Sequence, residues 1–216
     1  MPSLPPAHTT ALGTDADGPR CQLSWDYASV IGMLMYLTLN SWPDIQFAVH
    51  QCARFTHNPR ASHKQAVLRI CRYLKGTRDK GLVFRPKASL ALDCYVDADF
   101  AGLWKVENEN DPVCVKSRTG YVLLLGGCPL TWASRLQTEI ALSTVEAEYI
   151  ALSTAMRDLL PGRALLKQGD WGQVAIIILQ RVSNHEQGLG RQHRDHQIGR
   201  SCTQGDFLHK AYCSQV

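Results

Sequence analysis

Long apolar runs are missing from this sequence of 216 residues. The longest late run, Val174–Leu179, is far shorter than the roughly 20 apolar residues that span a bilayer. The first 20 residues lack the apolar stretch behind positive charge that marks a signal peptide. The eight cysteines contain no C-x-x-C pair, which argues against the disulfide framework of a small secreted protein. We therefore expect a cytoplasmic or nuclear protein with reduced thiols, neither secreted nor in contact with a membrane.

The composition indicates a folded chain with a weakly basic surface. Hydrophobic residues make up 45% of the sequence, which is enough for a packed core. The net charge is +4 and the isoelectric point is about 8.6. A mild positive charge fits a nucleic-acid partner, although many unrelated domains share it.

The first half of the folded region reads as helical. Apolar residues at helical spacing predict a helix from Ser24, its expected N-cap, to about Leu37. A second helix is expected from Pro43 to about Phe55. A third is expected over residues 61–75, ended by Gly76.

The second half reads as a sheet with one long helix. The pattern predicts strands over residues 81–84, 90–96, 118–125, 129–134 and 174–179, the third and fourth joined by the turn Gly126-Gly127. A helix is expected over residues 142–167, with Ser143 or Thr144 as N-cap. Its core candidates include Leu159 and Leu165, and Pro161 is expected to end or kink it.

These patterns divide the chain into four parts. We expect a flexible lead-in over residues 1–22, a helical segment over 23–78 and an α/β domain over 79–168. Residues 169–216 have poor hydrophobic periodicity and are rich in Gly, His, Arg and Gln, so we expect a divergent tail that is incomplete, irregular or disordered.

Two carboxylates stand at positions suited to a metal. Asp97 ends a strand predicted to be buried, and ligand sites of α/β sheets lie at such ends. Glu146 and Glu148 are two apart on the predicted helix, so only one can face the sheet, and the apolar neighbours of Glu148 favour it. Carboxylate oxygens are the ligands that Mg²⁺ prefers. From spacing alone, the favoured explanation is instead that Asp97 and Asp99 form a turn and that Glu148 is a solvated helix residue.

Several motifs in order resemble the Pol polyproteins of copia-type LTR retrotransposons. Three runs resemble the end of their reverse transcriptase region: Tyr27-Ala-Ser-Val-Ile-Gly-Met-Leu-Met-Tyr-Leu-Thr, Trp42-Pro-Asp-Ile-Gln-Phe-Ala-Val and Arg72-Tyr-Leu-Lys-Gly-Thr77. Four more resemble the ribonuclease H domain that follows: Tyr95-Val-Asp-Ala-Asp-Phe-Ala-Gly102, Lys116-Ser-Arg-Thr-Gly-Tyr121, Leu130-Thr-Trp-Ala-Ser134 and Ala141-Leu-Ser-Thr-Val-Glu-Ala-Glu-Tyr149. The resemblance covers residues 25–167.

The resemblance implies a fold, an activity and a cofactor. The fold is a ribonuclease H-like mixed sheet of five strands with flanking helices, preceded by a helical tail of the polymerase. The activity is cleavage of the RNA strand of an RNA–DNA hybrid by two Mg²⁺ ions. Asp97 matches the first catalytic and metal-binding aspartate, and Glu148 matches the glutamate on the first helix of the domain. The hybrid and the rest of the polyprotein are the implied partners.

The sequence departs from this family at two carboxylates. Residues 174–179 are followed directly by Gln180-Arg181, with no acidic residue where the resemblance implies the third metal ligand. Asp206, in Gln204-Gly-Asp206-Phe-Leu-His-Lys210, is a candidate for the fourth catalytic and metal-binding position. The polymerase motif Tyr-x-Asp-Asp is absent, so no polymerase activity is expected. We expect impaired cleavage; the alternatives are a non-catalytic nucleic-acid-binding remnant and a pseudogene product.

One helix offers a basic face for phosphates. The predicted third helix carries His63 and four cations on the side away from its apolar residues, and the four candidates for nucleic-acid binding are Lys64, Arg69, Arg72 and Lys75. Such contacts are electrostatic and independent of base sequence. A solvated helix face explains the same pattern without a ligand.

Overall fold

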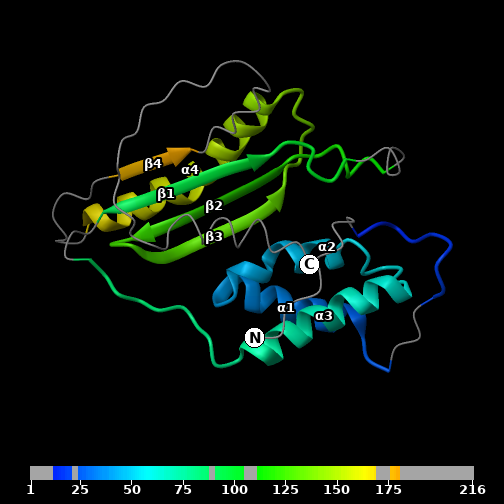
Figure 1. Cartoon of the computed structure of the whole chain (residues 1–216). Coiled ribbons are helices and arrows are strands. Elements are labelled where there is room, and N and C mark those ends of the chain that lie inside the picture. Colours follow the sequence, from blue (N-terminus) through cyan, green and yellow to red (C-terminus); the bar gives the residue numbers. More distant parts are fainter. Residues whose placement is uncertain (1–11, 21–23, 88–90, 105–110, 169–175, 181–216) are drawn as a thin grey trace, which may run out of the picture.

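A computed structural model describes residues 12–20, 24–87, 91–104, 111–168 and 176–180. It shows a mixed α/β protein, in which a group of three helices lies beside a sheet and a fourth helix covers the sheet (Figure 1). The expected α/β class is confirmed. Most of the predicted lead-in and of the predicted tail lies outside the described residues, and the domain boundaries stay predictions.

The helical segment contains α1 (Tyr27–Asn40), the short 3₁₀ helix η1 (Pro43–Ile45), α2 (Gln46–Ala53) and α3 (Ala61–Thr77). Asp26, rather than Ser24, caps α1, because its carboxylate accepts a hydrogen bond from the Ser29 backbone N–H at 2.9 Å. Pro43 begins the second helical stretch as expected, since its missing N–H costs nothing in a first turn.

These helices share one apolar core. Each helix contributes buried side chains: Tyr27, Ile31, Leu34, Ile45, Val49, Val67 and Ile70. The Tyr27 hydroxyl donates to the Cys52 carbonyl oxygen at 3.0 Å, which satisfies a polar atom inside this core. Because α1 is apolar on every side, it also exposes Met33, Tyr36 and Leu39.

The sheet consists of β1 (Leu92–Asp99), β2 (Arg118–Leu125), β3 (Cys128–Leu136) and β4 (Ile176–Gln180), in the order β3-β2-β1-β4. The first three strands pair antiparallel, and β4 pairs parallel with β1. Gly126 and Gly127 take φ of 58° and 81° in the expected hairpin turn between β2 and β3. The order and directions are consistent with a ribonuclease H-like sheet, of whose five strands the described residues form four.

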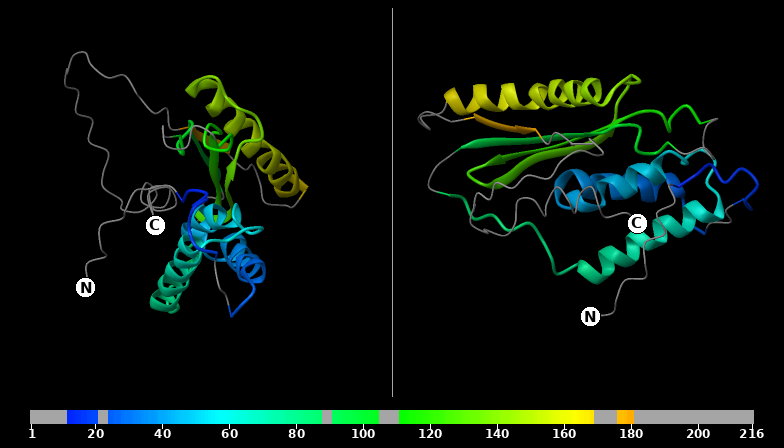
Figure 2. Two further views of the ribbon diagram at one scale, coloured as in Figure 1. Left: turned by 90° about the vertical axis from the view of Figure 1, so that its right-hand side faces the viewer. Right: turned by 45° about the horizontal axis from the view of Figure 1, so that its top comes forward.

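Helix α4 (Thr144–Gln168) connects β3 to β4 and covers β1 and β2 (Figures 1 and 2). Ser143 caps it by accepting from the Glu146 N–H at 3.1 Å. Its sheet-facing stripe is Ala147, Ala151, Ala155 and Leu159, each with no exposed surface. Three alanines let the helix approach the sheet closely, and Leu159 fills the space that remains beside Leu92.

The helical segment packs against the edge strand β3. The Trp132 indole Nε1–H of β3 donates to the Thr38 carbonyl of α1 at 2.7 Å. Arg54, next to α2, pairs with Asp111 in the loop before β2 at 2.5 Å. Trp132 therefore lies at the interface between helices and sheet, where the half-buried ring keeps a polar partner.

Three local predictions are wrong. Residues 81–84 form no strand, since Val83 and Phe84 are exposed and β1 already pairs on both edges. Helix α3 passes Gly76 by one residue. Helix α4 ends at Gln168, within one residue of its expected end, and Pro161 does not end it. Leu165 is 68% exposed, because it lies off the stripe that faces the sheet.

Candidate metal and nucleic-acid site

Asp97 and Glu148 lie at the same end of the sheet. Asp97 stands near the carboxyl end of β1, opposite Gly120 of β2. Because β1 and β3 run in the same direction, the end of β3 and the start of α4 lie at this end too. Glu148 is the fifth residue of α4 and only 9% exposed, whereas Glu146 is exposed. The prediction that Glu148 is the inward carboxylate is confirmed.

The donor chemistry at this end fits a single Mg²⁺ better than a pair. Mg²⁺ commonly takes one or two carboxylates and fills its other positions with water and phosphate oxygens. Asp97 is half-buried, and its Oδ1 accepts from the Ala98 N–H at 3.1 Å, which orients the carboxylate. Among the described residues, no three His, Cys, Asp or Glu side chains come together as a metal site. Asp206, the expected further ligand, lies outside the described residues.

A buried arginine, Arg118, joins this end of the sheet to the helical segment. It is 3% exposed and pairs in register with Asp99 of β1. Its guanidinium lies 4.9 Å from the Phe47 ring of α2 and donates to Ser134 of β3. Burial raises the pKa of Asp99, and the positive charge of Arg118 opposes that rise. Within Lys116-Ser-Arg-Thr-Gly-Tyr121, sequence reasoning identified a motif but missed this role, which depends on a helix far away in the chain.

Asp99 also shapes the turn after β1. The Asp99 carboxylate lies where a Cβ at Gly102 would stand, at 1.9 Å from that position. Ala101 takes a positive φ of 46°, and its N–H donates to the buried Ser117 hydroxyl at 3.3 Å. The glycine of Tyr95-Val-Asp-Ala-Asp-Phe-Ala-Gly102 therefore leaves room for the Asp99 carboxylate, which a side chain at this position would displace.

His50 of α2 lies in the same interface. Burial, together with the positive charges of Arg118 and Arg135, lowers the pKa of His50 to about 4. The ring is therefore neutral at pH 7 and resists protonation down to mildly acidic pH. No sequence pattern indicated this histidine.

We expect acid to weaken this interface through His50. The unfolded chain takes up a proton near pH 6.5 and the folded chain only near pH 4, so stability falls as the pH drops through that window. The loss is on the order of 2–3 kcal/mol. Urea unfolding at pH 7 and pH 4.5 measures it, and His50→Gln should show a smaller difference between the two. The exposed His57→Gln is the matched control, and an unchanged pH response in His50→Gln contradicts the assignment.

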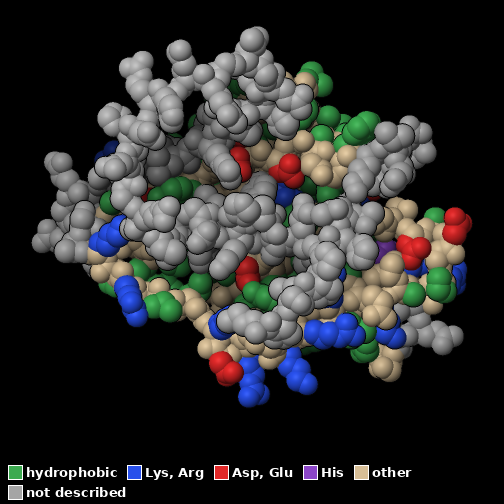
Figure 3. Space-filling model, in the orientation of Figure 1, with side chains coloured by type: hydrophobic (Ala, Val, Ile, Leu, Met, Phe, Trp, Pro, Cys, Tyr) green, Lys and Arg blue, Asp and Glu red, His purple; other side chains and the backbone are tan. Residues whose placement is uncertain are grey.

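The four cations of α3 lie on the side of the helix opposite its core. Arg72 and Lys75 are exposed, while Lys64 and Arg69 are half-buried. Their Cα positions span an arc of roughly 140° at 100° per residue, opposite the buried Val67 and Ile70. Lys and Arg side chains gather along the edge of the molecule where α3 runs (Figure 3).

His63 does not belong to this basic face, which corrects the sequence prediction. It has no exposed surface, and its ring stacks on Phe55 with a centroid distance of 4.0 Å. Nδ1 accepts from the Arg60 N–H at 2.9 Å, so Nε2 carries the proton and donates to the Gly13 carbonyl at 2.9 Å. Residues 13–20 pack over the start of α3 and bury this histidine. The helical pattern alone gave no sign of this contact.

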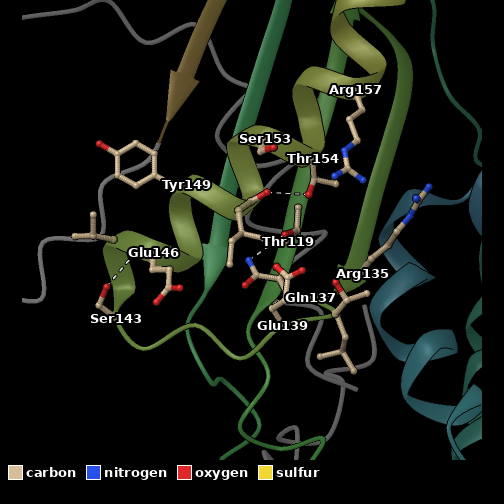
Figure 4. Close-up of a pocket in the computed structure, with 14 residues that line it drawn as sticks. Thr119, Arg135, Gln137, Glu139, Ser143, Glu146, Tyr149, Ser153, Thr154 and Arg157 are labelled. Atoms are coloured by element: carbon tan, nitrogen blue, oxygen red, sulfur yellow. Dashed lines mark hydrogen bonds between the residues drawn. The ribbon is translucent and has the colours of Figure 1, made fainter.

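A cleft of about 600 Å³ lies between the first half of α4, the start of β2 and the end of β3 (Figure 4). Its lining includes Thr119, Gln137, Glu146 and Arg157. Gln137, which follows β3, is 4% exposed and contacts the first turns of α4. None of the described helices is long and apolar enough to cross a membrane. The five cysteines among the described residues are free thiols.

Proteins similar to this chain include Pol polyproteins of plant transposons. Over 134 residues, 62% of the chain, it is 36% identical to the retrovirus-related Pol polyprotein from transposon RE1 of Arabidopsis thaliana. It is 40% identical over 134 residues to that from transposon TNT 1-94 of Nicotiana tabacum. The chain spans only 8% and 9% of these two proteins.

A shorter relative matches over most of its length. The chain is 38% identical over 132 residues, 61% of its own length, to the secreted RxLR effector protein 161 of Plasmopara viticola and covers 87% of it. No family model and no solved structure matches the chain. The resemblance to Pol polyproteins expected from the motifs is confirmed, whereas the assignment of a ribonuclease H activity stays a prediction.

Proposed function

We propose that this chain, which is similar to the retrovirus-related Pol polyproteins of transposons, is a Pol segment with a ribonuclease H-like domain over residues 79–168. The domain binds RNA–DNA hybrids and holds Mg²⁺ through Asp97 and Glu148. It cleaves hybrids weakly or not at all, because one metal-binding carboxylate is missing. The helical segment over residues 23–78 supports the hybrid through the basic face of α3.

The observation that carries the proposal is the placement of Asp97 and Glu148. One stands near the end of the central strand β1, and the other is buried in the second turn of the helix that connects β3 to β4. This helix covers the sheet from one side, so Glu148 lies at the edge where β1 ends. A bound Mg²⁺ supplies Lewis-acid stabilisation to a phosphate oxygen, and these two carboxylates would fix its position.

Hybrid binding is expected to depend on salt and on α3. Each cation that contacts a phosphate contributes about one unit to the slope of log affinity against log salt. Replacing Arg72 and Lys75 by Gln should lower that slope by about two and leave the fold intact, since both are exposed. Fluorescence anisotropy of a labelled hybrid measures the slope. The pair Arg163→Gln and Lys167→Gln, exposed on α4, is the matched control, and equal slopes for both pairs contradict the role of α3.

The catalytic part is tested with the whole chain, a labelled hybrid, and Mg²⁺ or a chelator. We expect cleavage at the limit of detection, and calorimetric Mg²⁺ binding that Asp97→Asn and Glu148→Gln each remove. The exposed Glu146→Gln is the matched control and should bind as the native chain does. Robust Mg²⁺-dependent cleavage that Asp97→Asn abolishes overturns the prediction that cleavage is impaired. Hybrid binding without Mg²⁺ binding favours the non-catalytic remnant instead, and failure to bind either overturns the proposal.

A further inference from the structure

The geometry points to Gln137 as a positioning residue that ties the first turns of α4, and with them Glu148, to strand β2 beside Asp97. The inference rests on the proposed function for the meaning of Glu148 and Asp97. The link itself is a property of the fold and can be measured without metal or hybrid.

Gln137 makes two hydrogen bonds from a single amide nitrogen. Nε2 donates to the Thr119 hydroxyl of β2 at 3.1 Å and to the Ala147 carbonyl of α4 at 2.9 Å (Figure 4 shows the first). The residue is 4% exposed and its two acceptors are buried, so water cannot replace these bonds without opening the packing. The Gln137 backbone is anchored as well, because its N–H donates to the Ser117 carbonyl at 2.8 Å.

The chemistry of the acceptors fixes how the amide is oriented. A carbonyl oxygen accepts but never donates, so the group that faces Ala147 has to be the NH₂ and not the oxygen. A glutamate of the same shape offers only acceptors there. The position therefore requires a donor of this length, which Gln alone among the uncharged side chains provides.

The two anchored residues are each next to a candidate metal ligand. Ala147 directly precedes Glu148 in α4. Thr119 precedes Gly120, the residue of β2 that pairs with Asp97. One buried amide thus joins the backbone that carries Glu148 to the strand that holds Asp97, across the junction where α4 begins.

Positioning contacts of this kind typically change metal affinity by 10- to 100-fold when removed. In Gln137→Met, which keeps length and apolar volume, we expect Mn²⁺ affinity to fall at least about 10-fold. Amide hydrogen exchange of the whole chain should speed up about 10-fold or more over residues 147–151, while the second half of α4 changes little. Thr119→Val should show the same local rise in exchange to a smaller extent. Thr119→Ser, which keeps the hydroxyl, should exchange at the native rate. The exposed Thr138→Val is the control.

The exchange experiment decides on Gln137 alone. Unchanged exchange at residues 147–151 in Gln137→Met and Thr119→Val overturns the inference, as does an equal rise over α4 and the sheet, which marks general destabilisation. Absence of Mn²⁺ binding by the native chain overturns the proposed function without affecting the exchange result. A local rise in exchange with unchanged Mn²⁺ affinity overturns the positioning role, because the first turns of α4 then move without consequence for the metal.

Discussion

Replacing Arg118 with Met is expected to lower the free energy of unfolding by about 3 kcal/mol at pH 7, because it leaves the half-buried Asp99 without the positive charge of the buried Arg118. The variant also loses the contact with Phe47, at 4.9 Å, and the hydrogen bonds to Ser134. Chemical unfolding at pH 7 measures the loss. A loss below about 1 kcal/mol contradicts this account.

The loss in Arg118→Met should shrink in acid. Without the arginine, the pKa of folded Asp99 rises further above its ordinary value of 3.8, so the folded state binds a proton that the unfolded state has already released. Stability therefore falls as the pH rises through this range, and the cost is larger at pH 7 than at pH 4. Adding Asp99→Asn to the variant should recover part of the stability. Arg72→Met, at an exposed position of α3, is the control and should stay within about 0.5 kcal/mol of the native chain.

Leu159→Ala is expected to cost about 2–5 kcal/mol, because it opens a cavity between α4 and the centre of the sheet. Leu159 has no exposed surface and packs in one cluster with Leu92 and Cys94 of β1 and Ala155 of its own helix. The neighbouring alanines cannot fill the space left by a truncated leucine. Thermal unfolding should shift by about 2–4 °C for each kcal/mol.

Leu165→Ala is the matched control on the same helix. Leu165 is 68% exposed, and its truncation should change stability by less than about 0.5 kcal/mol. Both leucines qualified as core residues from the helical pattern alone. Equal losses in the two variants contradict the placement of α4 on the sheet.

Most of the secondary structure follows from local patterns in the sequence. Strand β2, at Arg118–Leu125, begins and ends where its apolar run predicts, and Gly126-Gly127 makes the turn that follows. The strand expected at residues 81–84 has a short apolar run too, yet it does not pair with the sheet, and β1, which follows it in the chain, is already paired with β2 and β4. Pro161 interrupts one hydrogen bond of α4, but the apolar stripe before it and the exposed position of the proline let the helix continue.

The sequence predicted the residues of the candidate site whose orientation depends only on their own helix or strand. Glu148 could be distinguished from Glu146 because a helix turns 100° per residue, so their apolar neighbours differ. His63 could not be placed, since the chain that buries it comes from residues 13–20 and contacts α3 only in the folded state. The roles of Arg118, His50 and Gln137 were equally invisible, because each depends on partners more than nine residues away.

The sequence by itself determined the α/β class, the relation to Pol polyproteins, and the candidate metal ligands Asp97 and Glu148. These follow from periodicity and from ordered motifs, which are local properties of the chain. Only the tertiary structure decided which polar side chains lie buried between elements: Arg118 against α2, and Gln137 between β2 and α4. The physical reason is that a buried donor needs an acceptor at hydrogen-bond distance, and the fold alone brings such partners together.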